Sequence, residues 1–355
     1  TPIKSSAASD VYKRQRMTYT NVKKILENED SEVISEYSDF VDMFKRMENL
    51  AKILRTKRFK RGSIDFDFPE TKIKLNEKGE PVEIMPYDRN TATRIIEDFM
   101  LIANETVAED YFWQELPFLY RSHENPDPEK IHRLGTFINN FGYSIKIGDE
   151  IHPKELQKLL SKIEGSPEEN LISRLTLRSM KRAQYTTECI GHFGLAAKYY
   201  CHFTSPIRRY PDLQIHRIIK ENLHGGIKQK RIEHYNEILP ETAKHTSMTE
   251  RRADDAERDT DKLKMVQYME KHIGETFDGV ISGMMAWGIY VELPNTIEGM
   301  VSVVSLRDGF YVYDENHYEM VNETTGRTFK LGQRVRVVVS GCDRILRTID
   351  FEILS

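Results

Sequence analysis

The chain contains 355 residues, of which 39% are hydrophobic and 30% are charged, and its formal net charge is −4. This composition is typical of a globular protein with two or three domains and argues against a uniformly basic nucleic-acid-binding protein. No apolar run approaches the roughly 18 residues that a membrane helix needs, so we expect no membrane partner. The three cysteines, Cys189, Cys201 and Cys342, lack the spacing of a zinc site, and we interpret them as reduced thiols of a cytoplasmic protein.

The first part of the chain is predicted to be largely helical. Residues 1–16 are polar and show no periodic pattern, so we interpret them as a disordered or artefactual lead-in. Residues 17–60 place apolar side chains at helical spacing, and residues 91–109 do the same. Between these helices, residues 64–68 alternate apolar and charged side chains. This alternation predicts a strand that forms a hairpin with a second strand at residues 82–85.

The most informative segment is residues 200–213, with the sequence Tyr-Cys-His-Phe-Thr-Ser-Pro-Ile-Arg-Arg-Tyr-Pro-Asp-Leu. Pro206 and Pro211 each fix the backbone angle φ near about −65° and disfavour helix in the residue before them. Arg208 and Arg209 are therefore held on a stiffened loop. Paired guanidinium groups on a rigid loop suit bidentate recognition of a phosphodiester, so RNA and DNA are the first ligands to consider.

A helix is predicted directly after this loop. Asp212 occupies the expected N-cap position, and Ile215, Ile218 and Ile219 follow at helical spacing. The surrounding stretch, residues 171–224, carries nine Lys and Arg but only three Asp and Glu. A locally positive stretch of this kind suits a phosphate channel, although solvated helix faces produce similar counts.

The last quarter of the chain changes pattern. A long charged helix is predicted at residues 245–272. Short alternating strands are then expected at residues 277–282, 288–293, 300–304 and 335–340, with glycines between them. This pattern is typical of a small closed β-barrel.

The loop at residues 200–213 resembles the signature near the end of the catalytic domain of the ribonuclease II / ribonuclease R family, the processive 3′→5′ exoribonucleases, with bacterial ribonuclease R as the nearest likeness. The final segment resembles the OB-fold RNA-binding domain named after ribosomal protein S-one. Its matching motifs are Trp287-Gly288-Ile289-Tyr290-Val291 and Glu298-Gly299-Met300-Val301. The resemblance implies an α+β catalytic-domain fragment at residues 17–272, followed by an all-β OB-fold barrel at residues 273–355.

This resemblance also implies roles for individual residues. Arg208, with Arg209 beside it, would contact the scissile phosphate and stabilise the charge that develops there. The residues that would bind RNA are Tyr19, Phe66, Phe68, Glu97, Phe277, Trp287, Tyr290, Asp343 and Arg347. In the family, the matching tyrosine and glutamate approach ribose, and the aromatic residues stack on bases.

Structural explanations remain open for several of these residues. Either arginine of the loop could instead pair with Asp212 or with a helix C-terminus. Glu97 could be an acid that interacts favourably with a helix N-terminus. Phe66 and Phe68 lie on one side of the predicted strand, which suits a hydrophobic core equally well.

The family hydrolyses phosphodiesters with magnesium held by an aspartate cluster of the form Asp-x5-Asp-x-Asp-Asp. The sequence does not contain this cluster: Asp65 and Asp67 form only a pair, and the acids at residues 254–261 alternate with arginines on a predicted helix. We therefore expect magnesium in the complete enzyme, no metal ligands in this partial copy, and little or no activity of this chain alone.

The resemblance thus implies that the chain is part of a hydrolytic, processive 3′→5′ exoribonuclease that degrades single-stranded RNA to nucleoside 5′-monophosphates, and we expect a monomer. The alternative is a non-catalytic RNA-binding protein that uses the barrel and the basic loop without cleavage.

Overall fold

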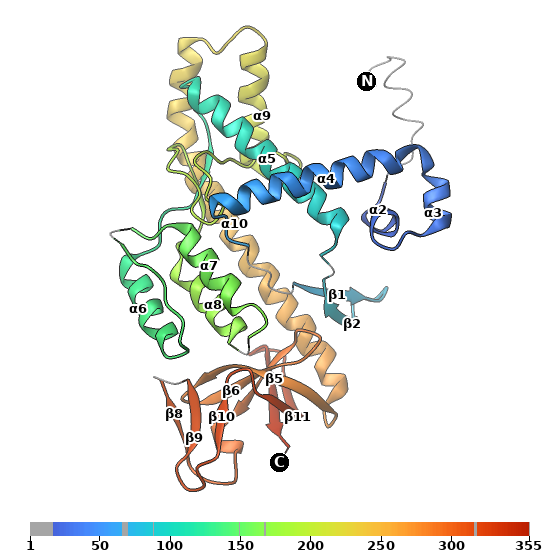
Figure 1. The fold of residues 1–355 in the computed structure, drawn as a ribbon, viewed down its shortest axis with the longest axis vertical. Helices are drawn as coiled ribbons and strands as arrows, with labels where there is room; N and C mark the ends of the chain where they lie inside the picture. Colours follow the sequence, from blue (N-terminus) through green and yellow to red (C-terminus); the bar gives the residue numbers. More distant parts are fainter. Residues whose placement is uncertain are drawn as a thin grey trace.

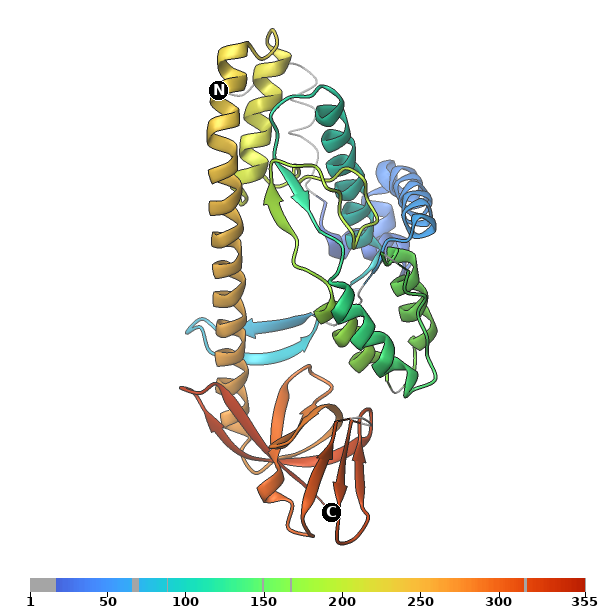
Figure 2. The same cartoon turned by 90° about the vertical axis from the view of Figure 1, so that its left-hand side faces the viewer.

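The computed structural model describes residues 17–354, except for residues 66–69, 88, 149, 167, 316 and 317. A helical part and a β-barrel are joined by one long helix, α10 (Gln229–Met269), which runs along the length of the molecule (Figures 1 and 2). Helix α9 (Tyr210–Leu223) lies beside the first half of α10, and the barrel lies at its other end. None of the described helices is both long and apolar enough to cross a membrane.

The other helices belong to the part of the chain that precedes α9. They are α2 (Tyr19–Leu26), α3 (Ser31–Glu36), α4 (Ser38–Arg61), α5 (Thr91–Trp113), α6 (Pro128–Asn139), α7 (Pro153–Ile163) and α8 (Glu169–Ser179). Two small antiparallel pairs accompany these helices, namely β1 (Thr71–Leu75) with β2 (Pro81–Pro86), and β3 (Tyr120–Ser122) with β4 (Gln184–Thr186). This mixture of helices and small sheets confirms the α+β prediction for the first part of the chain.

Helix α5 is the central helix of this part. It begins with a capping box, in which the side chain of Asn90 accepts a hydrogen bond from the Thr93 backbone N–H and the Thr93 side chain bonds back. Its buried face includes Ile95, Leu101 and Ala108, which repeat at helical spacing. Burial of each large apolar side chain stabilises the fold by about 1.5–3 kcal/mol, so the helix is held by packing more than by propensity.

The predicted first strand of the hairpin was wrong in position. Residues 64 and 65 are in no strand, and residues 66–69 lie outside the described residues; the strand that pairs with β2 is β1, which begins at Thr71. The reason is the turn, where the Asn76 side chain accepts hydrogen bonds from the backbone of Lys78 and Glu80. A hairpin's register follows from its turn, and this turn pairs Thr71 with Pro86. The predicted second strand, at residues 82–85, is confirmed by β2.

The predicted start of the long helix was also wrong. Helix α10 begins at Gln229 rather than at residue 245, and Pro240 lies inside it. Proline lacks an N–H and leaves the carbonyl of Asn236 without its helical donor. Both residues are exposed, so water can bond this carbonyl, while Tyr235 and Leu239 are buried in the core and hold the helix in place.

The barrel is closed by five strands in the order β11-β12-β7-β6-β5. The strands are β5 (Thr276–Met285), β6 (Gly288–Glu292), β7 (Glu298–Ser302), β11 (Arg334–Asp343) and β12 (Thr348–Ile353). Their neighbours run antiparallel except for β12 and β7, which are parallel. Gly299 permits this closure, because a side-chain carbon there would overlap the ring of Phe351. The prediction of an all-β OB-fold barrel is confirmed.

Two features of this region were missed in the sequence. A separate sheet consists of β8 (Tyr311–Asp314), β9 (Glu319–Asn322) and β10 (Thr328–Lys330), and β12 is the fifth barrel strand. The barrel core extends beyond the barrel itself, because Val266 and Met269 of α10 and Ile84 of β2 pack into it. Shared burial of these side chains fixes the barrel against the long helix and the hairpin.

Candidate nucleic-acid interface

The loop that precedes α9 is anchored from the inside by Asn104 of α5. The side chain of Asn104 is fully buried, accepts a hydrogen bond from the Phe203 backbone N–H (3.0 Å) and donates one to the Tyr200 hydroxyl (3.2 Å). The thiol of Cys201 donates to the Asn104 carbonyl, and the His216 ring stacks on Phe203. These contacts fix the loop backbone, because leaving the buried amide and N–H groups unpaired would be costly.

The two adjacent arginines of the loop have different surroundings. Arg209 donates to the carboxylate of Asp212 at 2.7 Å, and Asp212 is fully buried. Asp212 also accepts a hydrogen bond from the Ser205 backbone N–H at 2.8 Å. Arg208 is exposed, and within the described part of the chain no carboxylate pairs with it. One guanidinium therefore fixes the loop, and the other is available to a ligand.

The predicted N-cap was wrong. Helix α9 begins at Tyr210 with Arg209 at the N-cap position, and Asp212 lies inside its first turn. Pro211 explains the difference, because proline is well accommodated in the first turn of a helix, where its missing N–H needs no partner. From inside the turn, the Asp212 side chain reaches back to the loop instead of capping the helix from outside.

An enclosed polar layer lies behind the loop. The Tyr185 hydroxyl lies 2.9 Å from the His202 ring, and Arg121 donates to Glu250 of α10 at 2.6 Å while its guanidinium covers the Tyr185 ring. Burial lowers the pKa of His202 to about 2, and the nearby positive charges of Arg209 and Arg121 add to this shift. The imidazole is therefore neutral at physiological pH and acts as a fixed hydrogen-bonding group.

Glu97 and Tyr19 lie on neighbouring helices. The carboxylate of Glu97 accepts two hydrogen bonds from Arg89, at 2.9 and 3.0 Å, and Arg89 also contacts Asp65. Glu97 lies in the second turn of α5, seven residues before Asn104, so the two share a helix face about 10 Å apart. Tyr19 is the first residue of α2 and is exposed. Phe66 and Phe68 lie outside the described residues.

The barrel carries the remaining predicted contacts. Trp287 is 59% exposed, and its indole N–H donates to the Tyr290 hydroxyl at 3.4 Å, so the two rings form one exposed aromatic edge. Phe277 instead packs partly into the barrel core. Asp343 accepts hydrogen bonds from two backbone N–H groups of the following turn, and Arg347 forms a 2.5 Å ion pair with Asp259 of α10.

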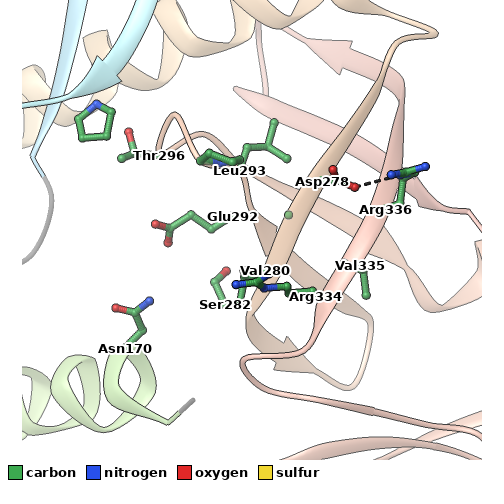
Figure 3. A pocket seen from close by; sticks show the side chains of 13 residues that line it. Asn170, Asp278, Val280, Ser282, Glu292, Leu293, Thr296, Arg334, Val335 and Arg336 are labelled. Atoms are coloured by element: carbon green, nitrogen blue, oxygen red, sulfur yellow. Dashed lines mark hydrogen bonds and ion pairs between the residues drawn. The ribbon is translucent and has the colours of Figure 1, made fainter. Parts of the chain in front are cut away.

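The predicted residues thus form two groups rather than one. The loop with Arg208 leads into α9 and lies beside the middle of α10, where Tyr185 contacts both His202 of the loop and Glu250 of α10. The aromatic edge belongs to the barrel, which lies at the C-terminal end of α10 (Figure 1). Between the barrel and α8 lies a cleft of about 790 Å³, lined by both carboxylates and arginines (Figure 3). Arg174 of α8 crosses to the barrel near this cleft and pairs with Glu292 (2.7 Å) and Glu298 (3.2 Å).

No metal centre is present in the described ranges, where no three His, Cys, Asp or Glu side chains are arranged to hold an ion. Asp98, the buried acid of α5, is occupied by Arg55 and Arg58 at 2.6 Å each. All three cysteines are free, and Cys201 is buried. Burial raises the pKa of Cys342 to about 11, which disfavours its thiolate as a metal ligand.

Comparison of the sequence with models of known protein families identifies the family of this chain. The RNB domain profile matches residues 5–225, and the S1 RNA binding domain profile matches residues 270–354. The chain belongs to the RNB family. This confirms the resemblance inferred from the loop and from the barrel motifs, and nucleases of this family are generally dependent on divalent metal ions.

Individual relatives agree with this assignment. Ribonuclease R 1 of Lactococcus lactis is 43% identical over 341 residues, which cover 96% of this chain and 42% of the relative. Ribonuclease R of Thermotoga maritima is 43% identical over 351 residues, covering 98% and 49%. The apo structure of Mycoplasma genitalium RNase R superposes with a TM-score of 0.84 at 26% identity, covering 96% and 53%. The chain spans about half the length of these relatives.

Several residues of the site carried no signal in the sequence. Asn104, Tyr185, Arg121 and Glu250 are far apart along the chain and belong to no motif, yet they surround the loop. A buried polar residue at one helix position is indistinguishable from an exposed one until the packing is known. The signal that was available is the long apolar face of α5, in which Asn104 is a polar interruption.

Proposed function

We propose that the chain forms part of a processive 3′→5′ exoribonuclease that degrades single-stranded RNA to nucleoside 5′-monophosphates. The observation that carries the proposal is the difference between the two adjacent arginines of the loop. Arg209 is paired with the buried Asp212, whereas Arg208 is exposed on the same anchored backbone. An exposed guanidinium on an anchored backbone, without an internal partner, can stabilise the charge that develops on a phosphate during cleavage. Anchoring of the backbone matters because it leaves only the side chain to be ordered when the phosphate binds.

We further propose that Arg208 acts on the 3′-terminal phosphodiester and that Glu97 reads ribose. Glu97 lies on the face of α5 that also carries Asn104, the anchor of the loop. A carboxylate accepts a hydrogen bond from a 2′-hydroxyl, which DNA does not offer. Arg89 donates two hydrogen bonds to this carboxylate, so the orientation of the Glu97 side chain is set before RNA binds.

The divalent ion that the family uses would activate water and neutralise the leaving oxygen, and we propose that it is magnesium. The side chains in the described ranges do not fit such an ion. We accordingly propose that this chain alone binds RNA and cleaves it slowly or not at all. A cytoplasmic, monomeric protein is also proposed, in keeping with three free cysteines.

A second candidate is a non-catalytic RNA-binding protein. It is favoured by one observation, the lack of a carboxylate cluster in the described ranges, since binding through Arg208 and the Trp287 edge requires no metal. Labelled single-stranded RNA incubated with this chain and magnesium separates part of the question. Substantial release of mononucleotides would contradict the proposal that this chain is inactive alone and would exclude the non-catalytic alternative.

Crosslinking tests the role of Arg208 directly. A single-stranded RNA with 4-thiouridine at its 3′ end should crosslink to the loop at residues 200–213, and the same base at the 5′ end should not. Arg208→Ala should weaken RNA binding, whereas Arg178→Ala, which removes an exposed cation of α8, serves as the charge-matched control. Crosslinks of the 3′ end to the barrel alone would overturn the proposal.

A further inference from the structure

A groove of about 520 Å³ lies between α9 and the first turns of α10, outside the sites described above. It begins at Tyr210, two residues after Arg208, and continues along α9 past Arg217 and Lys220. Arg231, His234 and Tyr235 of α10 line its other side, and Glu221 lies on the α9 side. The groove therefore starts where the RNA-binding loop ends, and its walls belong to two packed helices rather than to mobile loops.

The charge of this groove is positive once its internal pairs are considered. Glu221 accepts hydrogen bonds from Arg231 at 2.9–3.3 Å and from the Tyr235 hydroxyl at 2.7 Å, so its negative charge is compensated. Arg217 and Lys220 are exposed, and in the described part of the chain no carboxylate pairs with either. Two uncompensated cations one turn apart on a helix face are suited to an anion.

Arg217 is held by neutral groups. Its guanidinium lies 3.4 Å from both the Tyr210 hydroxyl and the Gln214 side-chain oxygen, and 5.8 Å from the centre of the Tyr210 ring. Gln214 is buried, so its position is fixed. These contacts orient the guanidinium without neutralising it, and the Tyr210 ring, 47% exposed, offers a face on which a base can stack.

We propose that this groove binds a nucleotide through its phosphate, with Arg217 and Lys220 on the phosphate and Tyr210 on the base. The proposal rests on the proposed function, which creates a nucleoside 5′-monophosphate close to Arg208. Two sources of the phosphate share this chemistry: a released mononucleotide, or a phosphate of the RNA chain itself. A mononucleotide bound in this groove would no longer occupy the cleavage site at Arg208, but it would still lie beside the loop.

Binding of adenosine 5′-monophosphate to the full chain, measured by equilibrium dialysis, tests the proposal. The double variant Arg217→Ala/Lys220→Ala should weaken binding by at least about tenfold, because two charge-assisted contacts are lost. The control Lys228→Ala/Lys230→Ala removes two exposed cations that do not line the groove, and it should change binding less than about twofold. Tyr210→Phe keeps the ring and loses only the weak 3.4 Å contact with Arg217, so it should lose less than about twofold in affinity, whereas Tyr210→Leu should bind several-fold more weakly.

The probes and outcomes separate the alternatives. Adenosine, which lacks the phosphate, should bind more weakly than the monophosphate. If Arg217→Ala/Lys220→Ala weakens only the monophosphate, the ligand is a released nucleotide, and if it weakens oligoadenylate equally, the ligand is the RNA backbone. Both results support a phosphate site. Equal losses in the two double variants, or equal binding of adenosine, would overturn it.

Failure of this proposal is distinguishable from failure of the proposed function. Oligoadenylate binding by Arg208→Ala is measured with the same preparation. If Arg208→Ala weakens oligoadenylate binding as expected but the chain does not bind the monophosphate, only the proposal for the groove is overturned. Monophosphate binding without any Arg208 effect supports the groove and contradicts the role given to the loop.

Discussion

Replacement of Arg209 by alanine removes the cation that pairs with a fully buried carboxylate. Asp212 is 0% exposed and Arg209 is 16% exposed, and their atoms are 2.7 Å apart. Removal of one partner from a buried ion pair costs about 3–5 kcal/mol, because the other charge stays buried without compensation. We expect a loss near about 3 kcal/mol, since the Ser205 backbone N–H continues to bond Asp212.

Urea denaturation measures this loss. The chain has two tryptophans, so a Trp287→Phe background leaves Trp113 at the end of α5 as a fluorescent probe of the helical part. The denaturation midpoint should fall by roughly 1 M or more for Arg209→Ala. The double variant Arg209→Ala/Asp212→Asn should recover at least about 1 kcal/mol, because it no longer buries an unpaired charge.

Arg208→Ala is the matched comparison. Arg208 is exposed and unpaired among the described residues, so its removal should change the free energy of unfolding by less than about 0.5 kcal/mol. Equal destabilisation by the two alanine variants, or a stable Arg209→Ala protein, would refute the assignment of one arginine to structure and the other to ligand.

Three further results are expected. Trp287→Ala should weaken single-stranded RNA binding by about 1–3 kcal/mol in a titration without changing stability, whereas Phe310→Ala, an equally exposed ring in the same part, should not. Asn104→Ala should destabilise the chain by roughly 2 kcal/mol in urea and weaken RNA binding as well, because the loop loses its buried anchor. Burial lowers the folded pKa values of His202 and of His192, whose ring packs against those of His123 and Tyr200, to about 2 and about 3. Stability should therefore fall as the pH drops below about 6.5, where these imidazoles take up protons in the unfolded chain but not in the folded one. Urea titrations at several pH values should show a loss of about 1.4 kcal/mol per pH unit for each imidazole, and a flat profile would contradict the enclosed neutral state.

Much of the fold was predictable because its signals are local. The period-two strands and glycines of the barrel specify their own pairing, and the two prolines around Arg208 mark a stiff loop without reference to other segments. The face of α5 was also recognisable from its apolar spacing. These features depend on residues that are close together in sequence, so the local patterns were sufficient to predict them.

Other features depend on partners that are distant in sequence. Helix α10 continues through Pro240 because Tyr235 and Leu239 are packed into a core that the local pattern does not show. The alternation at residues 64–68 predicted the first strand of the hairpin, yet the strand that the turn at residues 76–80 pairs with β2 is residues 71–75. Local propensity is overridden where tertiary packing or a turn supplies more free energy.

The candidate site likewise contains some residues that local patterns identify and others that depend on distant partners. The motif identified Arg208 and Arg209 together, but only the complete burial of Asp212 distinguishes them. Arg347, expected to contact RNA, is paired with Asp259 of α10, a partner that no motif indicates. Its role in RNA binding stays a prediction, as do the roles of the other site residues.

The salt dependence of RNA binding tests the central claim most directly. The affinity of the chain for oligoadenylate should be measured between roughly 50 and 200 mM salt, for the wild type and for Arg208→Ala. If Arg208 contacts an RNA phosphate, the variant should bind more weakly, and the slope of log K against log salt should be smaller by about 0.7. An unchanged affinity and an unchanged slope would show that Arg208 does not contact the RNA backbone.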